Sequence, residues 1–239
     1  MDEIRAVSRW SLAGQQSDLP SDSYLGGMPL VTPDFQWPTK NGHPLGFIGQ
    51  LRCADLALVP SNNGVLLFFY DNRHWGYSPK DIGHAVVVHQ RTLNQLEPPE
   101  LPRCEVPSFF GLRKKVVQPK VYRRVDLSLV ESRSYPSLER ELITFANAAD
   151  EECCIEFCAM IKPEIQIGGY PSPIQSDWME LDCVNACGIG EPEDWALLLQ
   201  LFAVGDMMWG DVGALYSFIH QDDLNTNRFD RVWMVSQCH

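Results

Sequence analysis

The sequence has no apolar run that could cross a membrane. A membrane-spanning helix needs about 18 consecutive apolar residues, and the 239-residue chain contains no such stretch. Its start, MDEIRAVSRWSLAG, also lacks the basic segment and long apolar block of a secretory signal. We therefore expect a cytoplasmic protein with no membrane partner.

Catalytic motifs are absent as well. The histidines form no H-x-x-x-H or H-E-x-x-H pattern, and no G-x-S-x-G turn presents a nucleophilic serine. The Gly-Gly-x-Pro segments lack the Lys-Ser/Thr pair of a phosphate-binding loop. A triad can also be assembled from residues far apart in sequence. These absences therefore favour a binding protein without excluding an enzyme.

Positive charge is scarce. The chain has 19 Lys and Arg against 31 Asp and Glu, a net charge of -12. Six of the positive charges lie in RKKVVQPKVYRR (113–124), so the remainder carries -12 minus 6, or -18. Such acidity disfavours nucleic acid and favours a basic partner, although it also keeps many proteins soluble. The basic run is either a phosphate-binding strip or, as we predict, an exposed strand.

Cysteine is plentiful, but its pattern does not indicate a cofactor. Among the eight cysteines, Cys154/Cys158 and Cys183/Cys187 have C-x3-C spacing. Zinc tolerates that spacing, yet no C-x2-C or paired histidine accompanies it. Residues four apart share one helix face, where buried cysteines pack as small apolar side chains. We expect this packing role, with no metal and no cofactor.

Short segments recur in the same order in both halves of the chain. Gly-Gly-x-Pro occurs at 26–29 and 168–171, FIGQL (47–51) corresponds to LLLQL (197–201), and GVLLFFYD (64–71) to GALYSFIH (213–220). The offset is roughly 150 residues, which indicates an internal duplication. We expect a single domain over 1–239, in which repeat units 24–92 and 165–237 form two similar lobes about a pseudo-twofold axis.

The pattern of apolar residues predicts an α+β fold of mainly antiparallel β-sheets with a few helices. Apolar runs bounded by Gly, Pro, Asn and Asp predict strands at 44–51, 64–71, 84–90, 195–202 and 213–219. Leucine, phenylalanine and alanine at helical spacing predict a helix starting near Ser137. We expect a second helix at 150–162. A short helix is predicted near 222, capped by Asp222 or Asp223. Four prolines in 93–111 predict a loop.

These segments resemble the YwqG-like family of bacterial domains. The resemblance is carried by LGGMP (25–29), GHPLGFIGQL (42–51), IGGYPSPIQ (167–175), MMWGDVGALYSFI (207–219) and FDRVWMVSQC (229–238), and it extends over about residues 24–239. It implies an α+β fold with internal duplication and brings no established activity. Some relatives are thought to be immunity proteins encoded beside toxins, so the resemblance implies a cognate toxin as partner.

Three polar residues within or beside the apolar runs have two interpretations. Gln50 and Gln200 recur in the two units, and Asp211 follows Trp209-Gly210 directly before a strand. A buried amide must be hydrogen-bonded, and an aspartate before a strand commonly shapes a turn through its carboxylate. We favour these structural roles. The alternative is a ligand or enzyme site in a cleft between the lobes, formed by Gln50, Gln200 and Asp211.

The candidate protein-binding residues are aromatic or charged. Arg73, Trp75 and Tyr77 follow a strand and are of the types that dominate binding hot spots. Acidic residues suited to a basic toxin, such as a nuclease, stand at Asp150, Glu151, Glu152, Glu191, Glu193, Asp222 and Asp223. The sequence therefore favours a non-enzymatic protein-binding module, most simply an immunity protein that occludes a toxin.

Overall fold

The computed structural model describes residues 7–93, 96–107, 113–160 and 163–239. Ten strands form one antiparallel sheet in the order β14-β13-β12-β11-β1-β10-β2-β5-β6-β7. Their bounds are β1 Arg9–Gln16, β2 Tyr24–Leu25, β5 Gly46–Arg52, β6 Val65–Tyr70, β7 Ala85–Gln90, β10 Val125–Ser134, β11 Ile165–Ile167, β12 Trp195–Phe202, β13 Ala214–His220 and β14 Trp233–Gln237. The predicted strands and the α+β class are confirmed.

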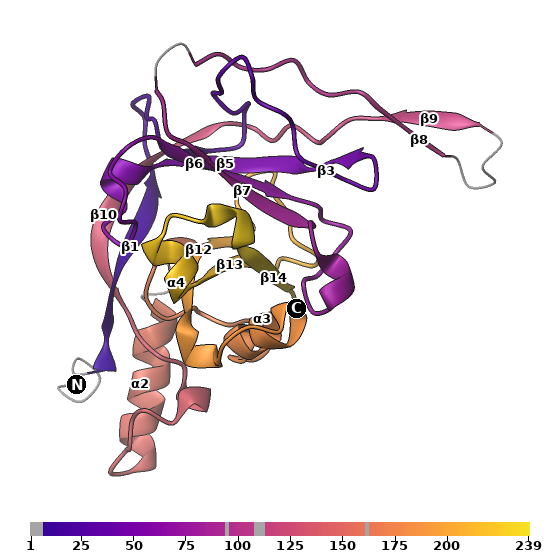
Figure 1. Cartoon of the computed structure of the whole chain (residues 1–239). Helices are drawn as coiled ribbons and strands as arrows, with labels where there is room; N and C mark the ends of the chain where they lie inside the picture. Colours follow the sequence, from indigo (N-terminus) through magenta and orange to yellow (C-terminus); the bar gives the residue numbers. More distant parts are fainter. Residues whose placement is uncertain (1–6, 94–95, 108–112, 161–162) are drawn as a thin grey trace.

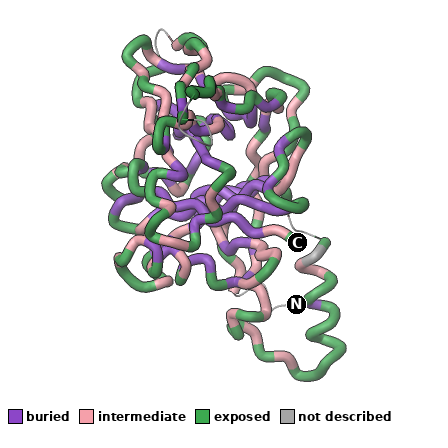
Figure 2. Tube along the Cα trace, turned by 90° about the vertical axis from the view of Figure 1, so that its right-hand side faces the viewer, coloured by how far each residue is buried: buried purple, intermediate pink, exposed green. Residues whose placement is uncertain are grey.

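The sheet folds so that its two ends face each other. In Figure 1, β5–β7 lie above β12–β14, and β1 and β10 join the two layers at one side. The space between the layers is filled by apolar side chains from both, among them Ile48, Phe68, Leu201, Leu215 and Ile219. The buried strands occupy the middle of the molecule in Figure 2. The region between the two halves of the sheet is therefore a hydrophobic core.

Each outer face of the folded sheet has its own cover. Helix α3 (Met179–Cys187) packs Met179 and Cys183 against Trp195 and Tyr216 of the second half. The first half is covered by the segment that contains Val31, Phe35, Trp37 and Leu45. That segment includes a small hairpin of β3 (Thr39–Lys40) and β4 (His43–Pro44). Two outer apolar clusters thus flank the shared core.

The two halves of the sheet have matching order and register. The order β2-β5-β6-β7 on one side matches β11-β12-β13-β14 on the other. Tyr24 pairs with Gln50 as Gln166 pairs with Gln200. Register shifts fall at Phe47/Gly49 and at Leu197/Leu199, three residues before each glutamine. This agreement is what a duplication would produce, and the duplication itself stays a prediction.

The helix predicted near Ser137 is wrong. Only a 3-10 turn, Leu138–Arg140, forms there, and Glu141 then adopts a left-handed conformation. The Ser137 hydroxyl donates to Asp177 (2.6 Å) instead of capping a helix. The segment is held by contacts with residues about 40 positions away in the chain, and these override its local helical pattern.

Two other helices begin at caps that the sequence pattern did not predict. Helix α2 spans Ala148–Met160, in agreement with the second predicted helix, whose last residues 161–162 lie outside the described residues. Its N-cap is Asn147, whose Oδ1 accepts from two backbone N–H groups. Helix α4 (Gln221–Asn225) is capped by Nδ1 of His220 rather than by Asp222 or Asp223.

A hairpin made of β8 (Cys104–Pro107) and β9 (Lys114–Val117) projects from the body (Figure 1). The predicted loop 93–111 therefore contains a strand, while its residues 94–95 and 108–111 lie outside the described residues. The prediction of an exposed strand in the basic run is confirmed, since Lys114, Lys115 and Val116 are exposed. Among the described residues of the two strands, only Val106 is buried.

Candidate binding surface

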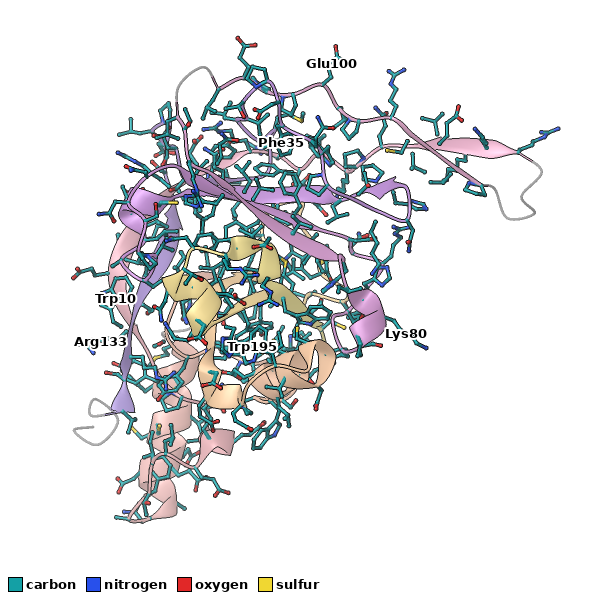
Figure 3. The ribbon with its side chains drawn as sticks, in the orientation of Figure 1. Trp10, Phe35, Lys80, Glu100, Arg133 and Trp195 are labelled. Atoms are coloured by element: carbon teal, nitrogen blue, oxygen red, sulfur yellow. The ribbon has the colours of Figure 1, made fainter. Side chains whose placement is uncertain are left out.

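The segment between β6 and β7 is fastened to the edge strand β14. The backbone oxygen of Trp75 accepts from the Ser236 N–H (2.9 Å), and that of Gly76 accepts from Nε1 of Trp233 (2.7 Å). The Tyr77 hydroxyl donates to the backbone oxygen of Ser236 (2.7 Å). This segment thus links the two edges of the sheet. Lys80 belongs to this segment, and its label in Figure 3 shows where the segment lies in the molecule.

Two aromatic rings of this segment remain exposed although their backbone is held. Trp75 is 45% exposed and Tyr77 is 43% exposed. Large aromatic side chains in a preordered segment lose little conformational entropy when a partner covers them. Burial and the nearby carboxylate of Asp182 on α3 raise the pKa of Tyr77 to about 12, so its hydroxyl stays protonated and donates to Ser236.

Arg73 is less available than the two rings. Its Nε and Nη2 donate to the two oxygens of Asp71 at 2.7 and 2.6 Å. Burial opposes ionisation of Asp71, but the hydrogen bonds from Arg73 hold the pKa of that carboxyl below its usual value. A partner that paired with Arg73 would therefore compete with an internal carboxylate.

The turn at 209–213 lies directly under Trp75. Gly210 has a φ of 56° and no side chain, and a Cβ at this position would lie 3.1 Å from the Trp75 ring. The buried Trp209 packs against Tyr70 and Tyr122, each with ring centroids 6.0 Å apart. Trp209 therefore anchors this turn to the core.

Asp211 does not shape this turn in the way we expected. The turn is closed by the backbone, since the Gly213 N–H donates to the Trp209 oxygen at 2.8 Å. Within the described part of the chain, the Asp211 carboxylate accepts no hydrogen bond, while its backbone oxygen accepts from His239. Asp211 is exposed and directly follows Gly210, the residue that lies close to the Trp75 ring. We call Trp75, Tyr77, Val212, Asp182 and Asp211 the aromatic patch.

The amide groups of Gln50 and Gln200 both hydrogen-bond to other residues of the protein. Gln50 Oε1 accepts from the Tyr24 hydroxyl and the Leu30 N–H, and its Nε2 donates to the Asp22 oxygen. Gln200 Oε1 accepts from the Ser172 N–H (2.7 Å), and its Nε2 donates to the Pro163 oxygen (3.3 Å). Both side chains act as the buried amides that we expected.

The structure does not bring the three cleft candidates together. Gln50 bonds to Tyr24, which belongs to the outer cluster of the first half. Gln200 and the hydroxyl of Tyr216, a member of the outer cluster of the second half, bond to the same residue, Ser172. The two glutamines thus face opposite outer sides of the folded sheet. Asp211 lies in the aromatic patch, apart from both amides.

Replacing Gln200 with leucine should lower the free energy of unfolding by about 1–3 kcal/mol, because the Ser172 N–H and the Pro163 oxygen lose their partner in a buried setting. The matched control is Asp211→Asn, which should change it by less than about 0.5 kcal/mol because the side chain is exposed and unbonded. Urea unfolding of both variants measures the difference. A Gln200→Leu protein as stable as the wild type would contradict the structural role of the amide.

The acidic candidates have different surroundings. Asp150, Glu151 and Glu152 are exposed in the first turn of α2. Glu191 and Asp194 form a capping box around the 3-10 turn Pro192–Asp194. Asp222 is exposed, but Asp223 is only 5% exposed, with Arg231 at 3.4 Å and Arg228 at 3.7 Å. The expectation that Asp223 belongs to an acidic surface is therefore wrong, because its charge is buried and paired.

Sequence reasoning missed a cluster of charged residues near the start of α3. Arg140 donates to both oxygens of Asp177 (2.5 Å each) and to Glu180 (2.7 Å). Asp177 and Glu180 are 4% and 8% exposed. No motif joins these residues, since Arg140 lies 37 and 40 positions from its partners. Only the fold brings them together.

The cysteine pairs lie on helices, as predicted. Cys154 and Cys158 are on α2, and Cys183 and Cys187 are on α3. Burial raises the pKa of the Cys158 and Cys187 thiols to about 11, so both are protonated at neutral pH. In the described part of the chain, no three His, Cys, Asp or Glu side chains are grouped to hold a metal ion.

The chain belongs to a family defined as a domain of unknown function (DUF1963), whose model matches residues 23–238. The match covers the folded sheet from β2 to β14 and includes both the aromatic patch and the Arg140 cluster. No curated protein matches the sequence. Among the described residues, no helix has both the length and the apolar character needed to cross a bilayer.

Proposed function

We propose that this protein is a non-enzymatic binding module that acts as an immunity protein, occluding a cognate antibacterial toxin through the aromatic patch. The observation that carries the proposal is the pair of half-exposed rings, Trp75 and Tyr77, in a segment bonded to β14 through the Trp75 and Gly76 backbone oxygens and the Tyr77 hydroxyl. Exposed aromatic side chains on a preordered backbone are the usual anchors of a protein interface.

The charge of the patch supports a basic partner. Asp211 follows Gly210, which lies close to the Trp75 ring, Asp182 acts electrostatically on Tyr77, and Arg73 is paired with Asp71. The whole chain carries -12, which would draw a basic protein such as a nuclease toxin towards it. The resemblance to YwqG-like proteins, some of which are thought to be immunity proteins, supplies the toxin as the class of partner.

The alternative of an enzyme or ligand site in a cleft between the lobes receives no comparable support. Apolar side chains fill the space between the two halves of the sheet. Gln50 and Gln200 have their amide groups bonded to their own chain. A ligand at either glutamine would have to replace these internal bonds, at a cost in stability.

Co-expression with each toxin gene encoded beside this one tests the proposal. The wild-type protein should restore growth against one toxin and bind it in a stoichiometric complex. Trp75→Ala should weaken that complex by about 30-fold, the effect of losing a hot spot worth about 2 kcal/mol. The matched control is Leu19→Ala, a side chain 75% exposed outside the patch, which should bind as the wild type does.

Two outcomes would contradict the proposal. Failure to neutralise any neighbouring toxin would remove the immunity function. Neutralisation that Trp75→Ala leaves unchanged would keep the function but move the contact surface away from the aromatic patch. Calorimetric titration with the purified toxin also reports the fraction of active variant. It therefore distinguishes a weaker complex of Trp75→Ala from a simple loss of folded protein.

A further inference from the structure

A cavity of about 450 Å³ opens between the start of α3, the turn after Arg140 and the beginning of β1. Its lining includes three aromatic side chains, Tyr170, Trp178 and Trp195. Figure 3 labels Trp195, which lies between the second half of the sheet and α3. The cavity has room for a ligand about the size of an amino-acid side chain with its backbone.

The lining of the cavity carries excess negative charge. Five carboxylates face two guanidinium groups, those of Arg9 and Arg140, an excess of three negative charges. The carboxylates belong to Glu139, Glu141, Asp177, Glu180 and Glu193. The two most buried share a single cation, since Arg140 bonds to both Asp177 and Glu180.

The guanidinium of Arg140 does not fully offset the loss of hydration of the two buried carboxylates, Asp177 and Glu180. Burial raises the pKa of Glu180, and the adjacent Arg140 only partly opposes that effect. A carboxyl whose pKa stays raised beside an arginine has lost more hydration than its partner returns. An additional positive charge in the cavity would therefore be stabilised by groups that the protein has already desolvated.

The aromatic lining favours an organic cation over a metal ion. The guanidinium of Arg9 stacks 4.1 Å from the centre of the Tyr170 ring, and that of Arg140 lies 5.3 Å from it. Trp178 lines the same cavity, is 56% exposed and makes no cation–ring contact with the described residues. An exposed indole beside carboxylates is a suitable face for a guanidinium or ammonium group.

We propose that this cavity binds an organic cation, a guanidinium or primary ammonium group on a short apolar chain. The cation lies between the Trp178 ring and the exposed carboxylates of Glu141 and Glu193, and the apolar chain packs against the ring. A free small molecule and an arginine or lysine side chain of a protein both present this chemistry. The inference does not depend on the aromatic patch or on a toxin.

Calorimetric titration at low ionic strength tests this site with three defined probes. Agmatine represents a free cation, N-acetyl-arginine methylamide a protein side chain, and N-acetyl-citrulline methylamide the neutral isostere of the second. At least one cationic probe should bind at one site per chain, and the citrulline probe should bind at least about tenfold more weakly. Preference for agmatine indicates a free ligand, and preference for the capped arginine indicates a side chain.

Variants of the cavity lining test whether the cation binds in this cavity. Glu141 and Glu193 are exposed, so Glu141→Gln/Glu193→Gln should fold normally and weaken the cation by about tenfold. Trp178→Ala should weaken it by about fivefold. The matched control, Glu151→Gln/Glu152→Gln, removes the same charge from α2, outside the cavity, and should leave the affinity within about twofold.

Three results would overturn the proposal. The first is no binding of either cationic probe. The second is equal binding of the citrulline and arginine probes, which would show that charge is not recognised. The third is equal weakening by the cavity and control variants, which would show that the cation responds only to the net charge of the protein.

Discussion

Replacing Arg140 with methionine should lower the free energy of unfolding by about 3–5 kcal/mol, the usual effect of removing one partner from a buried ion pair. Asp177 and Glu180 would then be left in the protein interior without a cation, since both bond to Arg140 and both are more than nine-tenths buried. Methionine retains much of the side-chain volume, so the loss reports the charge rather than a cavity.

The control for Arg140 is an exposed ion pair. Lys114 and Glu105 lie 2.8 Å apart, and their side chains are 74% and 57% exposed. Lys114→Met should therefore change the unfolding free energy by less than about 1 kcal/mol. Urea unfolding of both variants measures the contrast. Equal effects would contradict the claim that the Arg140 cluster holds residues 137–141 in place.

Replacing Gly76 with alanine should destabilise the protein by about 3 kcal/mol and abolish binding at the aromatic patch. Gly76 has a φ of 85°, and a Cβ there would lie 1.9 Å from the backbone oxygen of Met234. Because Gly76 lies between Trp75 and Tyr77, relief of this collision must move both rings away from β14.

Gly83→Ala is the matched control for that change. Gly83 lies in the same segment with a φ of 78°, and a Cβ there would meet nothing within 4 Å. It therefore carries the left-handed backbone strain, about 1 kcal/mol, without the collision. Urea unfolding and titration with the proposed toxin partner measure the two consequences. If Gly83→Ala impaired binding as strongly as Gly76→Ala, the docking of this segment on β14 would not explain the binding surface.

The strands could be predicted because their signal is local. Runs such as GVLLFFYD and WALLLQLF are short, apolar and bounded by turn residues, and each became a strand of the central sheet. The roles of Gln50 and Gln200 could be predicted for the same reason, since an amide within such a run must find partners when the strand is buried. Their backbone partners could not be predicted.

The failures have a common physical cause. The pattern after Ser137 is helical over a dozen residues, but Ser137 and Arg140 bond to Asp177 instead. Asp223 stands in an acidic run, yet its buried carboxylate is near Arg228 and Arg231. After Ser137, these tertiary contacts outweigh a helix propensity that is worth only tenths of a kcal/mol per residue. At Asp223, the fold brings two arginines to a carboxylate that the local run of acidic residues suggested was exposed.

The exposure of Trp75 and Tyr77 was a second feature that the local sequence pattern could not decide. Trp75 and Tyr77 could have folded onto the sheet as core residues. The segment is held to β14 through the backbone oxygens of Trp75 and Gly76 and the hydroxyl tip of Tyr77, which leaves about half of each ring surface exposed. Trp209, close to Asp211 in sequence, is buried instead. Whether a tryptophan is buried in the core or exposed at the surface therefore depends on where the fold places its segment, which the local sequence does not determine.

The sequence by itself determined the mainly antiparallel α+β class, five of the ten strands of the sheet (β5, β6, β7, β12 and β13) and the buried glutamines, because these depend on the spacing of apolar residues within one segment. The tertiary structure alone decided which polar residues meet. Folding of the sheet onto itself joined Trp75 to the turn at Gly210, separated Gln50 from Gln200, and placed Arg140 between Asp177 and Glu180. Such contacts join residues 37 or more positions apart, beyond the reach of any local pattern.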